Sequence, residues 1–327
     1  MKCRECKICN GIVCKGEIPG LGGKGNGSTF INNVESFKKY KIVFDVINNE
    51  EAIDTSIDFF NEKLSMPVMI APIAGIANNY GVDMSDLSYN EIMLKASKQL
   101  NTLCFIGDGM DIEKSFIQPL NMINRYDGKG VITMKPWVQK GIDLRIDALQ
   151  TNNFCALAMD IDSAGLPILK NSAIPTELKN TQKLNEIKNL TNKPFIIKGI
   201  MTKQSAQKAI ESGCDAIIVS NHGGRVLEDC VSTIDVLEEI VEVVNKKCLV
   251  FIDSGIRSAS DVFKSLALGA DGVLIGRPIA LQAVKNREQG VIDYLTKINT
   301  DLKEIMYMCG CKTIKDINKT MIKKIGG

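Results

Sequence analysis

The chain has 327 residues, a length that suits one α/β barrel as well as two smaller domains. Hydrophobic residues make up 45% and charged residues 24%, which argues against long disordered tails. The formal net charge of +2 gives no reason to expect nucleic acid, and no apolar run approaches the ~20 residues of a membrane span. The first residues, MKCRECKICNG, lack the apolar core of a signal peptide, so we expect a cytoplasmic protein.

Four closely spaced cysteines open the chain. Cys3, Cys6, Cys9 and Cys14 have the spacing C-x2-C-x2-C-x4-C, close to a ferredoxin run but with a longer last gap and a lysine in place of proline. Such thiols in a reducing compartment indicate a metal site, and we predict an iron–sulfur cluster or zinc. Reactive thiols and a plain cysteine-rich tail are the alternatives. The glycine-rich stretch at residues 16–27 cannot fold by itself, so the segment must dock on the barrel or stay loose.

Eight short apolar runs occupy the rest of the chain at intervals of ~22 to 39 residues. Each is apolar throughout, as expected for strands of a parallel sheet that is covered on both faces. The runs begin at Pro67, Thr102, Gly130, Cys155, Pro194, Ala216, Cys248 and Gly272. Because helical spacing separates them, we predict an α/β fold, a (β/α)8 TIM barrel with an N-terminal cysteine-rich extension; an open doubly wound sheet is the alternative. We place the cysteine-rich and glycine-rich extension with its lead-in at residues 1–58 and the barrel at residues 59–327.

Polar residues gather at the ends of six of these runs. Functional groups are expected there, because the active site of such a barrel lies at the C-terminal ends of its strands. The residues are Lys135, Asp160, Asp162, Lys198, Ser220, Asn221, His222, Asp253, Gly276 and Arg277. A purely structural barrel has no reason to carry charge at the same end of so many strands, so we predict an active site at this end.

The last two units carry the pattern of a phosphate site. Gly255 and Gly276 each stand where a strand turns into a helix, so that backbone N–H groups can approach a ligand. Arg257 and Arg277 supply positive charge. Tight turns alone explain the glycines but not the arginines, so we predict phosphate binding after strands seven and eight.

His222 is the only histidine of the chain. At the end of the sixth run, with Gly223 and Gly224 clearing space for it, its imidazole can act as a base near neutral pH. Asp162 is the candidate carboxylate that orients the ring, and Arg225 can bind a substrate carboxylate through its planar guanidinium. Lys198 ends the fifth run inside the barrel mouth and needs an anionic or electron-rich partner; a Schiff-base role is the alternative.

Several strings resemble one family of flavoenzymes. IIVSNHGGR, PFIIKGI, IDSGIRSASDVFKSLALGADGVLIGRP and EIMYMCGCKTIKDI are similar to segments of the FMN-dependent α-hydroxy-acid oxidases and dehydrogenases, which include glycolate oxidase and lactate oxidase. The resemblance is strong from about Pro194 to Ile317 and weaker from about Pro67 to Asp162. We find none before Phe59.

The resemblance implies an enzyme that oxidises a 2-hydroxy acid or a related alcohol with FMN. His222 then matches the base that removes the hydroxyl proton while a hydride passes to flavin N5, and Asp162 matches its partner. Arg225 matches the ligand of the substrate carboxylate. Lys198 matches the lysine beside flavin N1 and O2, where positive charge stabilises the reduced flavin.

The resemblance also implies a set of FMN contacts. The backbone of Ala71–Ala74 would pack against the isoalloxazine, and the last two strands would hold the ribityl chain and the phosphate. The expected contacts are Ala71, Pro72, Ile73, Ala74, Lys135, Asp160, Lys198, Ser220, Gly223, Asp253, Gly255, Arg257, Gly276 and Arg277. Lys135 and Trp137 stand where the family has glutamine and tyrosine, and Asp160 where it often has threonine.

The chain departs from the family near the substrate. No second arginine follows Asp162 before Lys170, and only 35 residues separate Asp162 from Lys198, about half of the family's usual number. We therefore expect a bulkier small-molecule substrate, with a protein electron carrier as a candidate partner. We also expect a homo-oligomer without membrane or nucleic-acid partners. An isomerase-type flavoprotein and a non-catalytic FMN-binding protein are the alternatives.

Overall fold

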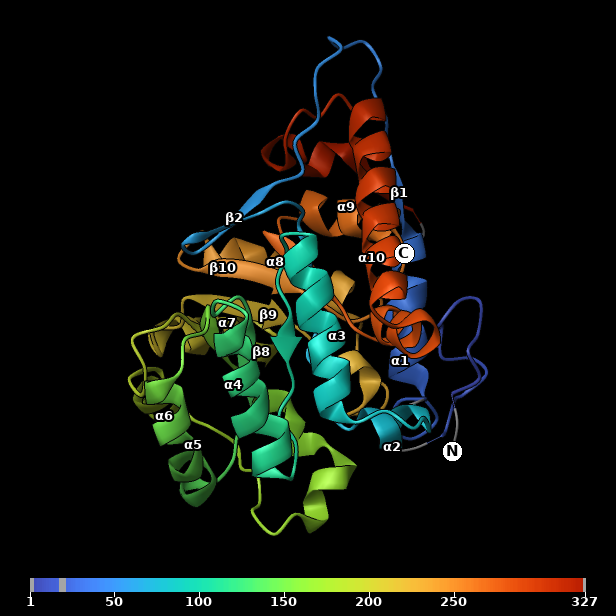
Figure 1. Ribbon diagram of the computed structural model, residues 1–327. Coiled ribbons are helices and arrows are strands. Elements are labelled where there is room, and N and C mark those ends of the chain that lie inside the picture. The colour runs from blue at the N-terminus through green and yellow to red at the C-terminus, as the bar shows by residue number, and fades with distance from the viewer. Residues whose placement is uncertain (1–2, 18–21, 326–327) are drawn as a thin grey trace.

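The computed structural model of the protein describes residues 3–17 and 22–325 (Figure 1). Residues 18–21 of the glycine-rich stretch lie outside this description. The barrel strands are β4 (Val68–Ile70), β5 (Phe105–Ile106), β6 (Val131–Met134), β7 (Ala156–Asp160), β8 (Phe195–Ile200), β9 (Ala216–Val219), β10 (Leu249–Ile252) and β11 (Gly272–Ile275). Each strand lies within one of the eight predicted runs.

These strands form one parallel sheet in the order β4-β11-β10-β9-β8-β7-β6-β5. A bridge between Ile70 of β4 and Cys104, next to β5, joins the two ends of this order. The sheet therefore closes into a barrel. The predicted (β/α)8 fold is confirmed, and the open doubly wound alternative is wrong.

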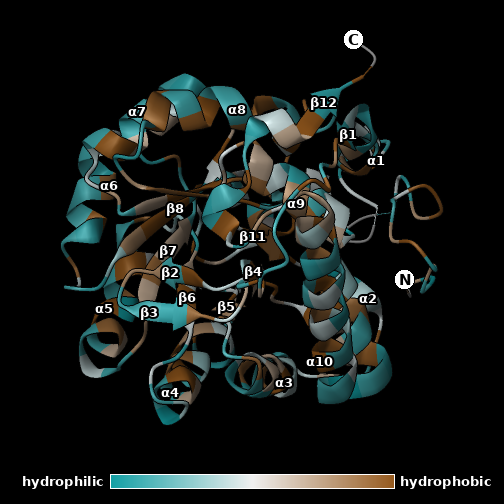
Figure 2. Ribbon diagram, turned by 90° about the horizontal axis from the view of Figure 1, so that it is seen from above, coloured by the Kyte–Doolittle hydropathy of each residue, from teal (hydrophilic) through white to brown (hydrophobic). Residues whose placement is uncertain are grey.

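Helices form a ring around the strands (Figure 2). They are α2 (Ile76–Tyr80), α3 (Asp86–Gln99), α4 (Gln118–Arg125), α5 (Gln139–Thr151), α6 (Thr181–Lys188), α7 (Lys203–Glu211), α8 (Thr233–Val244), α9 (Ala259–Ala267) and α10 (Arg277–Met308). Short turns of 3-10 helix lie at Ser36–Lys39, Ile161–Gly165, Pro167–Asn171, His222–Gly224, Ile314–Asp316 and Lys319–Met321, and a π-helical turn at Glu113–Ile117. Within the described residues, no helix is long and apolar enough to cross a membrane.

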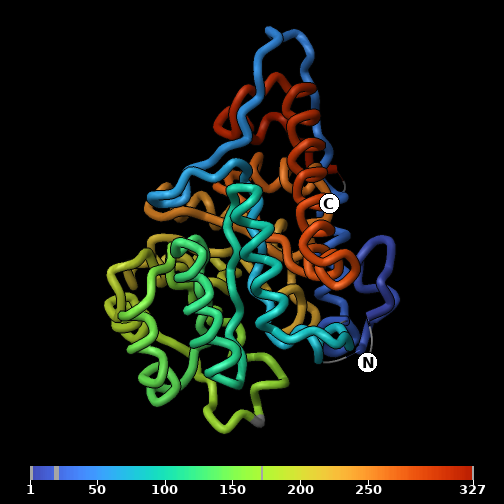
Figure 3. Tube along the Cα trace, viewed as in Figure 1, coloured from blue at the N-terminus to red at the C-terminus, as the bar shows by residue number. Residues whose placement is uncertain are grey.

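The N-terminal region docks on the barrel rather than staying loose. Helix α1 (Ser28–Glu35) packs against the turn at His222, and β1 (Tyr40–Ile42) pairs antiparallel with β12 (Ile322–Lys324) near the C-terminus. Lys24 Nζ donates to the Val226 carbonyl at 2.7 Å. The N-terminal region and the C-terminal strand β12 therefore lie on the same side of the barrel (Figure 3).

A hairpin plugs the end of the barrel where the strands begin. It consists of β2 (Ile57–Phe59) and β3 (Glu62–Leu64), and Ile57 lies against Gly272, the first residue of β11. Phe59 is fully buried, with its ring centroid 5.6 Å from that of Phe251 and 6.3 Å from that of Phe105. The aromatic plug fills the space that the strand backbones leave at this end.

We expect Phe59→Ala to lower the free energy of unfolding by about 3 to 5 kcal/mol, because a buried ring leaves a cavity that the barrel cannot close. Urea unfolding followed by far-ultraviolet circular dichroism measures the effect. Phe60→Ala, which removes the partly exposed neighbouring ring, is the control and should cost clearly less. Equal losses for the two variants would contradict the role of Phe59 as the plug.

Candidate active site

Two adjoining cavities open at the C-terminal ends of the strands. The first, the cradle cavity, is lined by the predicted site residues Ala71, Pro72, Ile73, Lys198, His222, Gly223, Arg225, Asp253, Gly255, Arg257, Gly276 and Arg277. The second, the wide cavity, has a volume of about 550 Å³ and adds Ala74, Lys135 and Asp160. Asp162 and Ser220 do not line either cavity, but both bond to His222. The structure thus brings the predicted residues of the barrel together at one end.

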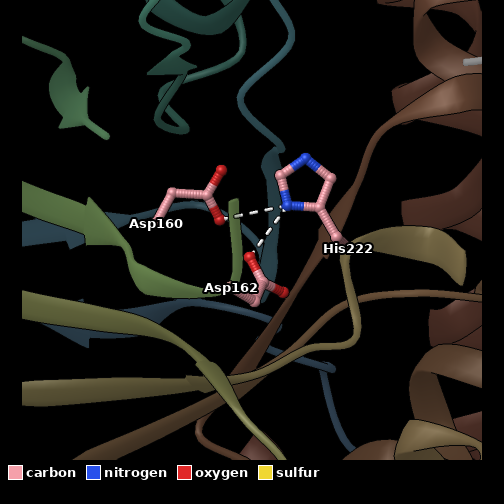
Figure 4. A group of neighbouring side chains, drawn as sticks. All are labelled: Asp160, Asp162 and His222. Carbon is pink, nitrogen blue, oxygen red and sulfur yellow. Dashed lines mark hydrogen bonds and ion pairs between the residues drawn. The ribbon is translucent and has the colours of Figure 1, made fainter. Parts of the chain in front are cut away.

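The imidazole of His222 faces two carboxylates (Figure 4). Its Nδ1 lies 2.8 Å from Asp162 Oδ1 and 3.3 Å from Asp160 Oδ1. The other ring nitrogen points away from both carboxylates. A carboxylate partner at Nδ1 favours the tautomer that carries its proton there, so Nε2 is left as the acceptor that faces a ligand.

The structure gives a further reason why residues 223 and 224 are glycines, beyond the space for His222 that the sequence suggests. Their φ angles are 64° and 82°, in the left-handed region. A Cβ on Gly223 would collide with the Arg277 guanidinium, and a Cβ on Gly224 would collide with the backbone of α1 at Phe30. The two glycines therefore let Arg277 and α1 approach the turn, in addition to shaping the backbone beside His222.

Three carboxylates surround the buried ammonium of Lys198. Its Nζ lies 2.8 Å from Asp160, 3.7 Å from Asp253 and 4.0 Å from Asp162. Asp160, Asp162 and His222 also form the one group of acidic, histidine or cysteine ligands in the described ranges whose ligand atoms all lie within 4.8 Å. Because Lys198 already bonds to the Asp160 carboxylate, we interpret this group as a charge-balanced network rather than as a metal site.

The network shifts the pKa values of Asp160 and Asp162 in opposite directions. Burial opposes ionisation of Asp160, but the charges of His222 and Lys198 outweigh it and hold the pKa of Asp160 well below its usual value. Burial, aided by the negative charge of Asp160, raises the pKa of Asp162 to about 6. Burial also opposes the charge of Lys198, but the three carboxylates outweigh it and raise the pKa of Lys198. Asp162 is therefore the carboxylate whose charge changes near neutral pH.

Lys135, which is buried, and Arg225, which is partly buried, are two cations at the wide cavity. Arg225 Nη2 donates to Asn79 Oδ1 at 3.2 Å, whereas its Nε is buried and has no hydrogen-bond partner among the described residues. Burial and the nearby charge of Arg277 lower the pKa of Arg225 to about 10. Burial also lowers the pKa of Lys135, partly offset by Asp160. Both side chains would be better satisfied with an anion in the cavity.

Sequence reasoning missed a buried network behind Lys135. Asp108 Oδ2 accepts from the Lys135 backbone N–H at 3.1 Å and from Trp137 Nε1 at 2.6 Å, and Asp108 Oδ1 accepts from Arg145 at 3.0 Å. The Arg145 guanidinium lies against the rings of Trp137 and Phe116, at 4.9 and 5.1 Å. Trp137, which stands where the resemblance has tyrosine, thus belongs to this network. The network fixes the end of β6 and with it Lys135.

The two arginines of the predicted phosphate site lie over one aromatic ring. Arg277 and Arg257 are 4.0 and 5.7 Å from the centre of the Phe30 ring of α1. A Cβ on Gly255, whose φ is 97°, would strike the Asn33 carbonyl of α1. Gly255 is therefore needed for the packing of α1 against the cavity wall as well as for a turn.

The four N-terminal cysteines line a third, small cavity together with Tyr80 and Arg277. Tyr80 and Arg277 also line the cradle cavity. None of these cysteines forms a disulfide. The segment predicted to bind metal thus lies directly beside the cradle cavity.

FMN fits the residues that line the two larger cavities. A phosphate matches the guanidinium groups of Arg257 and Arg277, and the backbone of Ala71–Ala74 offers a wall for a flat ring system. The buried, unpartnered Nε of Arg225 calls for a negatively charged ligand next to that wall. A barrel with these features is that of a flavin-dependent oxidoreductase.

Comparison with known proteins agrees with this interpretation. The family model described as FMN-dependent dehydrogenase matches residues 21–109 and 129–324. L-lactate oxidase from Lactobacillus jensenii is 30% identical, with 93% of this chain and 80% of that protein covered. 2-Hydroxyacid oxidase 1 from Mus musculus is 29% identical, with 92% and 90% covered. The chain belongs to the FMN-dependent dehydrogenase family.

A solved structure has the same fold. A mandelate oxidase variant with a monooxide FMN adduct superposes with a TM-score of 0.79 at 25% sequence identity, covering 93% of this chain and 94% of that chain. The family match begins at residue 21, so the expectation of no family resemblance before Phe59 is wrong. Cys3, Cys6, Cys9 and Cys14 precede the match.

We expect Arg277→Ala to weaken FMN binding about 10- to 100-fold, because a charge-assisted hydrogen bond to phosphate is worth roughly 1.5 to 3 kcal/mol. Titration of the apoprotein with FMN, followed by quenching of flavin fluorescence, measures the affinity. Arg125→Ala, on the exposed side of α4, is the control for loss of a positive charge. An unchanged affinity for FMN in the Arg277 variant would show that Arg277 does not bind the phosphate.

Proposed function

We propose that the enzyme oxidises a 2-hydroxy acid to the 2-oxo acid, with His222 as the base. The observation that carries this proposal is the 2.8 Å contact between His222 Nδ1 and Asp162, which directs Nε2 away from the carboxylates. Bound FMN supplies the hydride acceptor at its N5. His222 Nε2 takes the hydroxyl proton, and the Asp162 carboxylate stabilises the imidazolium that results.

Arg225 binds the substrate carboxylate in this proposal. Its buried Nε lacks a partner and it borders the same cavities as His222. Because the carboxylate is anchored there, the hydroxyl group can be placed against Nε2 in a fixed orientation. Lys198 supplies positive charge for the flavin from inside the barrel, and Arg257 and Arg277 hold the phosphate.

We further propose that Lys135 takes over part of the role of the missing second arginine. It is buried at the wide cavity, and its ammonium group forms no hydrogen bond or ion pair within the described residues. Leu166, Ile168 and Leu169 of the short segment after β7 line the same cavity. These apolar side chains suit a 2-hydroxy acid with a bulky aliphatic or aromatic side chain beside the flavin.

The alternatives are less well supported. A protein that merely binds FMN has no use for a base held by a buried carboxylate, and no contact in the described residues favours isomerisation over oxidation. For the electron acceptor we propose a protein carrier or an artificial dye rather than oxygen, because the segment at residues 163–193 is too short to cover the site fully. A cytoplasmic location stays a prediction.

We also propose that the protein forms a homo-oligomer. The loop after β1 projects from the barrel beside the end of α10 (Figures 1 and 3). Its Phe44 is 63% and its Ile47 93% exposed, next to Tyr307 at 55%. Contiguous exposed apolar side chains of this kind are typical of an interface between subunits.

We expect His222→Gln to keep FMN bound but to slow reduction of the flavin by substrate about 100- to 10,000-fold, the usual contribution of a general base. Anaerobic mixing with a 2-hydroxy acid, followed by bleaching of the flavin absorbance, measures the rate. A variant that reduces its flavin at the wild-type rate would show that His222 is not the base.

The acid side of the pH profile should depend on Asp162. Because the pKa of this carboxyl is about 6, kcat/KM should fall as the pH drops through that range and Asp162 becomes protonated. Replacement of Asp160 by threonine removes a negative charge that raises the pKa of Asp162, so the acid limb should move to lower pH. A limb that stays in place or moves upward would contradict this coupling.

The substrate proposal predicts higher kcat/KM for longer aliphatic or aromatic 2-hydroxy acids than for glycolate, and faster turnover with dye than with oxygen. Lys135→Met should raise KM for the preferred acid about 10-fold or more through loss of an ion pair. Lys140→Met, at an exposed position of α5, is the matched control. Fast oxygen-coupled turnover of glycolate would overturn the proposal.

A further inference from the structure

The four N-terminal cysteines have no role in the proposed FMN reaction. Cys3, Cys6, Cys9 and Cys14 come from a stretch of only twelve residues and all line one cavity. They precede the family match, which begins at residue 21. The seven other cysteines are scattered over residues 104–311. A function for this group must therefore come from the extension itself.

The extension is fixed to the barrel by contacts that do not use the sulfur atoms. The Cys3 backbone N–H donates to the Tyr80 carbonyl at 3.0 Å. Arg257 Nε donates to the Cys9 carbonyl at 2.6 Å. Arg4 and Glu17 form an ion pair at 3.2 Å across the segment. These contacts position the segment, and the fold thereby brings its four cysteines to one cavity.

The separation of the sulfur atoms distinguishes between the two metal sites that the sequence predicts. A single zinc ion with Zn–S distances of about 2.3 Å draws its four ligand atoms within roughly 4 Å of one another. In residues 3–17 and 22–325, no three of these sulfur atoms all lie within 4.8 Å of one another, as a single zinc ion would require. An iron–sulfide core stands between its thiolates and so holds them further apart. We propose that Cys3, Cys6, Cys9 and Cys14 ligate a four-iron, four-sulfide cluster.

The charges around the cavity suit such a cluster. Four thiolates around an iron–sulfide core carry net negative charge, and Arg277 lines the cavity from the barrel side. Arg257 bonds to the Cys9 backbone from the same side. Hydrogen bonds and positive charge near the sulfur ligands stabilise a cluster of this kind. Because Arg277 and Tyr80 border the cradle cavity as well, the cluster lies beside the phosphate end of the FMN site.

The test uses the full chain, purified without oxygen and incubated with equal amounts of ferrous and ferric iron and with sulfide. Iron, acid-labile sulfide and zinc are then measured per chain, and the protein is reduced with dithionite for electron paramagnetic resonance at low temperature. We expect about four iron and four sulfide per chain and the signal of a reduced cluster. Less than about 0.3 iron per chain, or one equivalent of zinc in its place, would overturn the proposal.

Substitution of all four cysteines by serine should abolish the bound iron and the resonance signal. FMN content and circular dichroism should be retained, because the barrel does not depend on the thiols. Cys155→Ser, outside the extension, is the control and should keep its iron. Iron that persists in the fourfold variant would contradict the assignment.

A second measurement does not depend on the folding of a variant. In the wild-type protein loaded with iron, the four thiols should resist alkylation by iodoacetamide, and they should react once the iron has been removed with a chelator. Mass mapping of the alkylated peptides identifies the protected residues. Equal alkylation of Cys3, Cys6, Cys9 and Cys14 before and after iron removal would refute the site even if iron is bound elsewhere.

Discussion

The active end of the barrel depends on how three carboxylates share one buried ammonium group. Lys198 lies within 4.0 Å of Asp160, Asp162 and Asp253. His222 contacts two of them, Asp160 and Asp162. Without the lysine, the largely buried negative charges would repel one another, and the cost would be several kcal/mol. With it, Asp160 stays ionised while Asp162 retains a raised pKa. A cation and a base thus stand close together at the barrel mouth.

The fold could be read from the sequence because each barrel strand is a continuous apolar run, and the polar residues at the run ends marked the site. The network of Asp108, Trp137 and Arg145 could not, since its members come from two separate βα units and carry no motif. The need for glycine at Gly224 and Gly255 could not be predicted either. It depends on the close approach of α1, which lies about 200 residues away in the chain, and such contacts leave no local pattern.

The N-terminal region packs against the two cradle arginines and against the loop that follows His222. Phe30 of α1 lies against both cradle arginines, and Lys24 ties the segment to the loop after His222. Asn26 and Thr29 bond to Glu228 and Leu227 of the same loop. The loop that carries the histidine is therefore held from outside the barrel, by residues that a division at residue 58 separates from it.

The contact between the N-terminal region and the loop after His222 has a consequence for synthesis of the protein on the ribosome. The cysteine segment and α1 emerge first, but the loop at residues 222–230 on which they rest is made about 200 residues later. At ordinary rates of synthesis this delay is roughly 10 to 40 s. During that time the thiols of the nascent chain have no barrel surface to pack against and stay exposed to oxidants. The order of the chain thus leaves the cysteine segment undocked until most of the barrel has been made.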